Sequence, residues 1–134
     1  ILQNKNLALL LPINPTKSAQ DLHAQISKEV NKNISVIISD SMTRPYRSGI
    51  TNFALASHNI QSLIDLKGED DMFGNKLKGT EIAVADELAS AAGLIMGQSD
   101  EGKPVIIIKG FNKSSYEVNN AFELIVNEND DLYR

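Results

Sequence analysis

The chain of 134 residues contains no cysteine, so disulfides and thiolate metal sites are excluded. It also lacks long apolar runs: the longest, residues 7–11 and 105–108, fall far short of the roughly 20 residues that a membrane-spanning helix needs. No signal peptide is recognisable. We therefore expect a cytoplasmic protein with no membrane span.

The chain also lacks a large net charge of either sign. The formal net charge is −4, and 42% of the residues are hydrophobic against 22% charged, which is ordinary for a folded globular protein. No general field favours nucleic acid or an anionic membrane, so an anion such as a nucleotide phosphate must be met by local positive groups. The length suits a single domain over residues 1–134. Because the chain opens at Ile1 without methionine, we expect a portion of a longer protein.

Familiar nucleotide and metal motifs are absent too. The sequence has no GxGxxG and no P-loop lysine motif, so a nucleotide would need an unfamiliar cradle. The two histidines, His23 and His58, have no partner histidine at ligand spacing, which argues against a zinc site. His23 falls on the apolar side of a predicted helix and is most simply a packing residue.

Hydrophobic periodicity predicts alternating strands and helices in the first part of the chain. Residues 7–11 are typical of a short buried strand, residues 16–32 of an amphipathic helix, and residues 34–38 of a central β-branched strand. This order suggests a parallel strand–helix–strand unit, in which Ser39 and Asp40 would stand at the carboxyl end of the second strand.

The second part of the chain has clearer boundary signals. We expect a strand over 50–57, a surface loop over 66–75, and a long helix over 81–96 that begins after Thr80 and ends at Gly97. A face of small residues on this helix, made of Ala85, Ala89, Ala92 and Gly93, favours close packing on the sheet or on another subunit. A strand over 105–109 and a weak helix or strand over 118–126 complete the prediction.

The stretch ISDSMTRPYRSG, residues 38–49, gathers chemistry at the predicted strand end. Asp40, with hydroxyl side chains around it, suits a hard cation bound through oxygen ligands. From the pattern alone, an aspartate that caps a turn through its own backbone is the simpler alternative. Arg44 and Arg47 suit phosphate or carboxylate groups, because guanidinium forms bidentate bonds to both. Pairing of these arginines with the acids at 69–71 is the simpler alternative.

Two further acidic groups have structural explanations. Residues 69–71 are three adjacent acids whose spacing fits no calcium-binding loop, so they indicate a solvated loop. Asp86 and Glu87 fall near the start of the long predicted helix, where the helix dipole favours negative charge, and this role is sufficient for them.

Four motifs in order resemble the coenzyme F420:L-glutamate ligase family: ISDSMTRPYRSG, KGEDDMFGNKL, GTEIAVADELASAAGLIMGQ and KPVIIIKGF. The closing DDLYR is similar to an acidic segment of that family. The resemblance covers the chain from about Leu9 to its end and implies that the family's amino-terminal part is missing. It also implies an α+β fold with a mixed sheet and packed helices, completed by an intertwined homodimer.

The resemblance implies an enzyme that adds L-glutamate to the phosphorylated acid tail of a deazaflavin coenzyme precursor, with GTP as co-substrate and magnesium or manganese as cofactor. In such chemistry a substrate carboxylate is phosphorylated and the glutamate amine then displaces the phosphate to form an amide. Asp40 matches a metal-binding aspartate of the family, and Thr80 and Glu81 lie near its second metal-binding stretch. Thr43, Arg44 and Arg47 fall in the loop that would contact substrate and nucleotide.

Two alternatives stay open from the sequence. Thr43 stands where the family usually has glycine and Asn52 where aspartate is common, which suits a module that binds metal and nucleotide without turnover. An amide ligase with a different acid acceptor is the other alternative, because none of these residues identifies a deazaflavin ring.

Overall fold

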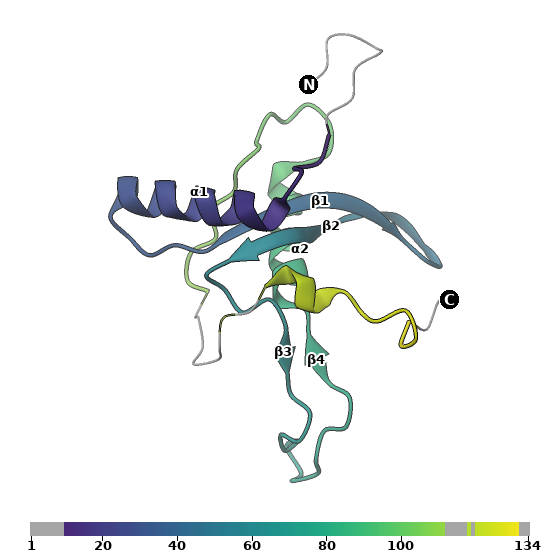
Figure 1. The fold of residues 1–134 in the computed structure, drawn as a ribbon. Helices are drawn as coiled ribbons and strands as arrows, with labels where there is room; N and C mark the ends of the chain where they lie inside the picture. The colour runs from purple at the N-terminus through teal and green to yellow at the C-terminus, as the bar shows by residue number, and fades with distance from the viewer. Residues whose placement is uncertain (1–9, 112–117, 119, 132–134) are drawn as a thin grey trace.

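The computed structural model describes residues 10–111, 118 and 120–131 and has mixed α and β structure (Figure 1). Its elements are, in order, α1 (Pro15–Val30), β1 (Val36–Arg44), β2 (Arg47–His58), β3 (Ile64–Asp65), β4 (Glu81–Ile82), α2 (Val84–Met96) and the 3-10 helix η1 (Ala121–Leu124). Strands β1 and β2 form one antiparallel pair, and β3 and β4 form another. Helices α1 and α2 both pack against the β1–β2 hairpin, whereas the β3–β4 arm projects away from it.

Helix α1 forms where its local signals predict it. The Asn14 side chain accepts a hydrogen bond from the Lys17 N–H at 2.9 Å, and Pro15 occupies the first turn, where its missing N–H costs nothing. Asn31 ends the helix in the left-handed conformation, with φ of 50°. The prediction of a helix over 16–32 is thus confirmed, with Ala19 as its fully buried residue.

The β1–β2 hairpin corrects the prediction of a parallel strand that stops at residue 38. Strand β1 continues through Asp40 to Arg44, and it pairs with β2 in antiparallel register, with Asp40 opposite Phe53. Ser39 and Asp40 therefore lie inside a strand and not beyond its carboxyl end. The cause is the close partner strand: Pro45 and Tyr46 turn the chain directly back, so extended pairing continues past the apolar residues. The strand predicted over 50–57 is confirmed within β2.

Two other predicted strands have different outcomes: one falls mostly on residues that the structure does not describe, and the other is not formed. The strand predicted over 7–11 lies mostly outside the described residues, and within them Leu10 and Leu11 are exposed and irregular. Residues 105–109 are described but form no strand, and Val105 and Ile107 are exposed. Their β-branched side chains favour a strand, but no described segment pairs with them. The region predicted over 118–126 contains η1.

Helix α2 begins later than predicted because the residues before it pair with another strand. Glu81 lies opposite Asp65 in the β3–β4 ladder, and the Thr80 carbonyl accepts from the Leu66 N–H at 2.9 Å. Thr80 is therefore not the N-cap, and the helix begins at Val84. The predicted end at Gly97 is confirmed.

Small side chains make the core. Ala54 of β2, Ala85 of α2 and Ala121 of η1 form its buried centre, with Ile37 and Leu124 packed against it. Ala89 is also buried, which confirms that the small-residue face of α2 packs on the sheet. The loop predicted over 66–75 is confirmed as an exposed turn-rich segment.

Neither α1 nor α2 combines the length and apolar character that crossing a bilayer would require, among the residues described. The cytoplasmic location stays a prediction.

Candidate functional site

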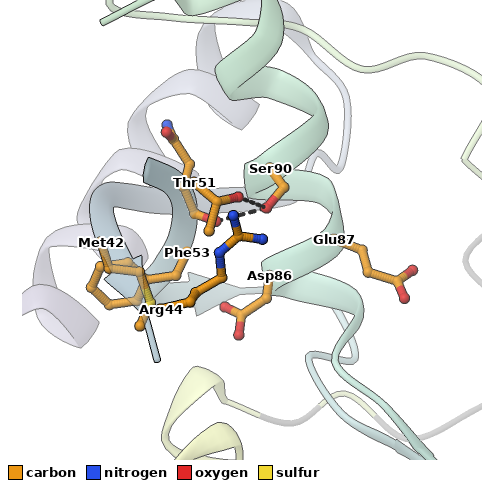
Figure 2. Close-up of a pocket in the computed structure, with 8 residues that line it drawn as sticks. Met42, Arg44, Thr51, Phe53, Asp86, Glu87 and Ser90 are labelled. Carbon is orange, nitrogen blue, oxygen red and sulfur yellow. Dashed lines mark hydrogen bonds between the residues drawn. The ribbon is translucent and has the colours of Figure 1, made fainter. Parts of the chain in front are cut away.

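A pocket of about 520 Å³ lies where the β1–β2 hairpin faces the first turns of α2 (Figure 2). It is a shallow hollow that is more open to solvent than enclosed. Strand residues make one wall and residues of α2 the other. The lining residues are Met42, Arg44, Thr51, Asn52, Phe53, Asp86, Glu87 and Ser90.

The alternation of β2 positions the strand side of the pocket. Asn52 and Ala54 are buried, whereas Thr51 and Phe53, which alternate with them along the strand, are only partly covered. Asn52 is fixed on the buried side, because its Oδ1 accepts from Gln98 Nε2 at 2.6 Å. Gly93 of α2 lies so close that a Cβ there would be 2.7 Å from the Asn52 Cγ. The small residues of α2 thus let the helix approach β2 at this point.

Asp86 joins α2 to the strand. Its Oδ1 accepts a hydrogen bond from the Ala54 backbone N–H at 2.8 Å. The half-buried carboxylate also stands in the first turn of α2, where the helix dipole favours its charge. The sequence predicted only this dipole role for Asp86. The structure adds its contact with β2 and its place in the pocket.

A chain of hydroxyl groups crosses between the two walls. Ser90 Oγ donates to the Asn52 backbone carbonyl at 2.7 Å, and Thr51 Oγ1 lies 2.8 Å from Ser90 Oγ. Neither hydroxyl was singled out from the sequence. The only sequence signal is the spacing of four between Asp86 and Ser90, which places both on one face of a helix.

Arg44 is the residue from the predicted binding loop that reaches the pocket. It ends β1 opposite Arg47, and Figure 2 shows its side chain extending from the strand toward α2. Arg47 and Thr43 do not line the pocket. Neither arginine forms an ion pair in the described part of the chain, and the alternative pairing with the loop acids is not observed there: Asp70 pairs with Lys76 at 2.8 Å instead.

The predicted metal ligands lie on separate elements. Asp40 is an exposed residue of β1 whose Oδ1 accepts from the Ser41 N–H at 2.7 Å. Glu81 lies in β4, where its carboxylate bonds Lys67 Nζ at 2.6 Å. The hydrogen bond to Glu81, together with the nearby Asp65, raises the pKa of Lys67. Thr80, the residue before Glu81, is exposed.

Within the described ranges, no three His, Asp or Glu side chains gather as a metal site. The described residues of one chain therefore do not by themselves complete a shell for magnesium or manganese. The metal assignment of Asp40, Thr80 and Glu81 stays a prediction.

The two histidines meet in space although their sequence spacing gave no sign of it. The ring centroids of His23 and His58 are 4.6 Å apart in an edge-to-face arrangement. His23 Nδ1 also lies 2.9 Å from the Ile34 carbonyl. These contacts join α1 to the end of β2, so they confirm the packing role predicted for His23.

Comparison with known proteins places these observations in a family context. Residues 3–110 match the family model described as F420-0:Gamma-glutamyl ligase. The coenzyme F420:L-glutamate ligase of Methanocaldococcus jannaschii is 50% identical over 103 residues, which cover 77% of this chain and 41% of that protein. The protein of the same name from Methanococcus maripaludis strain C7 is 43% identical over 128 residues, covering 92% of this chain and 50% of that protein.

A third relative has the same name and similar coverage. The coenzyme F420:L-glutamate ligase of Methanothermobacter thermautotrophicus is 43% identical over 105 residues, which cover 78% of this chain and 42% of that protein. The chain thus spans half or less of the length of these three relatives.

Proposed function

Because the chain belongs to the F420-0:gamma-glutamyl ligase family, we propose that its protein ligates L-glutamate to a deazaflavin precursor of coenzyme F420. The family match over residues 3–110 carries this proposal. The pocket beside α2 supports it, because Arg44 is a cation without an ion pair in the described chain and can hold an anionic substrate group.

We further propose that GTP drives the reaction. Transfer of its γ-phosphoryl group to a substrate carboxylate gives GDP and an acyl phosphate. The glutamate amine then attacks the acyl carbon, the bond to the phosphate oxygen breaks, and an amide and inorganic phosphate are formed. Arg44 and Arg47, side by side at the hairpin end, supply positive charge that such phosphate and carboxylate groups need.

Magnesium or manganese belongs to the same proposal, and when bound it would neutralise the charge of the polyphosphate. Asp40 offers an exposed carboxylate for it, but the described residues of one chain supply no full ligand set. We therefore propose that a second copy or another part of the polypeptide supplies the remaining ligands. A homodimer would provide the former.

The direct test combines the full polypeptide that carries this sequence with the deazaflavin precursor, L-glutamate, GTP and manganese. We expect a glutamylated product by mass spectrometry, formed in equal amount with GDP. Removing the metal with a chelator should abolish both. GDP release without an amide product would contradict the proposed reaction.

Two variants test whether Asp40 is a metal ligand. Asp40→Asn should weaken manganese-dependent GTP binding, measured by calorimetry, because it removes a charged oxygen ligand. Asp21→Asn makes the same chemical change on the exposed face of α1 and should leave GTP binding unchanged. Equal binding by the wild type and Asp40→Asn would contradict the metal assignment of Asp40.

The same assay distinguishes the two alternatives. A module without turnover, suggested by Thr43 and Asn52, would bind GTP but yield no amide. An amide ligase with another acceptor would yield product with a different acid from a panel of carboxylic acids and none with the deazaflavin precursor.

A further inference from the structure

Opposite charges line the two walls of the pocket without neutralising each other. Arg44 comes from the end of β1, and Asp86 comes from the first turn of α2. No ion pair joins them in the described part of the chain, although Figure 2 shows Arg44 extending toward the helix that carries Asp86. A ligand that carries both a carboxylate and an ammonium group would match this separation of charge.

The hydroxyl chain between the two walls of the pocket has a definite polarity. Ser90 has one hydroxyl hydrogen, and the Asn52 carbonyl, which can only accept, takes it. In the contact between Thr51 and Ser90, the donor must therefore be Thr51. With its hydrogen used in this way, Thr51 Oγ1 offers only lone pairs to a ligand. Where this strand residue meets α2, the pocket therefore presents a hydrogen-bond acceptor, which suits a donor such as an ammonium group.

Asp86 strengthens the same preference. One of its oxygens accepts from the Ala54 N–H, and the described chain provides no cation for the carboxylate. A half-buried carboxylate with one hydrogen bond keeps capacity for further donors, and a charged donor gives the strongest bond. Asp86 of α2 and Thr51 of β2 together therefore favour a positive ligand group at the place where the two walls meet.

Apolar side chains also line the pocket. Met42 and Phe53 line the strand wall. The pocket volume of about 520 Å³ admits a small molecule with room to spare. An aliphatic segment of a ligand can lie against these side chains and so remove part of its apolar surface from water.

We propose that this pocket binds a free α-amino acid, with its ammonium group on Asp86 and Thr51 and a carboxylate on Arg44. Its identification as L-glutamate rests on the function proposed above, whereas the arrangement of acceptors and donors rests on the structure alone. Asp86 and Thr51 thereby become substrate-binding residues, and Arg44 is assigned to a carboxylate of the amino acid in place of a nucleotide phosphate.

The test compares L-glutamate with glutarate, which keeps both carboxylates and lacks the amine. Each is titrated calorimetrically into the full polypeptide and into two variants. Asp86→Asn should weaken L-glutamate binding about 10- to 100-fold, the effect of losing a charged hydrogen bond, and leave glutarate binding unweakened. Arg44→Gln should weaken both ligands by a similar factor, because each presents a carboxylate.

The controls separate ligand contact from folding. In Asp86→Asn the side-chain carbonyl can still accept from the Ala54 N–H, so the melting temperature should stay close to that of the wild type. Asp21→Asn, which removes an exposed carboxylate of α1 outside the pocket, should bind both ligands like the wild type.

Three results would overturn the proposal: a wild type that binds neither ligand at millimolar concentration, L-glutamate binding unchanged in both variants, or equal weakening of glutarate and L-glutamate by Asp86→Asn. The glutamylation assay is read separately. If the binding pattern is as expected but no product forms, the proposed reaction is rejected and the amino-acid pocket is kept. If product forms but both variants bind L-glutamate like the wild type, the reaction is kept and the pocket is rejected.

Discussion

At the scale of single residues, Asp71 organises the turn between β3 and β4. Its Oδ1 accepts from the backbone N–H groups of Phe73 and Asn75, both at 2.8 Å. These bonds, chiefly the backbone hydrogen bond from Asn75 and then the bond from the Asn75 side chain, lower the pKa of Asp71 from its ordinary value of 3.8. The ionised carboxylate therefore stabilises the turn fully at pH values above its ordinary pKa. This stabilisation is lost as the pH falls through the lowered pKa of the folded state.

We expect the amide proton shifts of Phe73 and Asn75 to follow one titration with a midpoint below 3.8 when measured by NMR. Asp71→Asn should remove this step, because no ionisable group is left to change the two hydrogen bonds. Asp70→Asn, which changes the neighbouring acid that pairs with Lys76, should retain it. A midpoint at or above 3.8 would contradict the bonding of Asp71 in this structure.

At the scale of elements, the contact of α2 with β2 depends on Gly93. A glycine inside an exposed helix usually costs about 1 kcal/mol relative to alanine. Here a Cβ would stand 2.7 Å from Cγ of Asn52, a buried side chain that Gln98 also holds. The helix would have to move away from the strand, so overpacking outweighs the gain in helix propensity.

We therefore expect Gly93→Ala to lower the free energy of unfolding by about 1–3 kcal/mol in urea titrations, against the usual direction for this substitution. Gly79→Ala is a suitable control, since a Cβ there meets nothing within 4 Å. If Gly93→Ala stabilised the protein, the close approach of α2 to Asn52 would be wrong.

The elements that the sequence predicted best are those with local signals. Helix α1 has an asparagine cap, a proline in its first turn and a regular apolar spacing, all within 17 residues or so. The strands depend on partners elsewhere in the chain. Nothing local in residues 38–44 shows that pairing with β2 continues, or that residues 105–109 lack a partner in the described chain.

The same distinction applies to the site. Arg44 was found because it belongs to a compact motif that the sequence displays. Asp86 and Ser90 were missed as pocket residues, because their roles come from contacts with β2 more than 30 positions earlier. The acidic start of a helix has a sufficient local explanation in the dipole, and only the packed structure reveals the further contact.

At the scale of the whole molecule, the described chain buries small side chains and exposes large ones. The buried apolar residues are mostly alanines, whereas Leu94 and Ile95 of α2 are 89% and 58% exposed. Val105 and Ile107, in the segment that follows, are 76% and 77% exposed. Large apolar side chains exposed in such numbers suit a surface that another polypeptide covers.

We expect the isolated chain of 134 residues to self-associate, because burying such side chains in a second copy removes apolar surface from water. Sedimentation equilibrium over a tenfold range of concentration should show a dimer or larger species, and Leu94→Gln should weaken the association. Ile13→Gln changes an exposed apolar residue outside both segments and serves as the matched control. A single monomeric species at every concentration would contradict the proposed dimer of this chain. In that case another stretch of polypeptide would have to cover the exposed surface. The relatives, which are about twice as long as this chain, have such additional length.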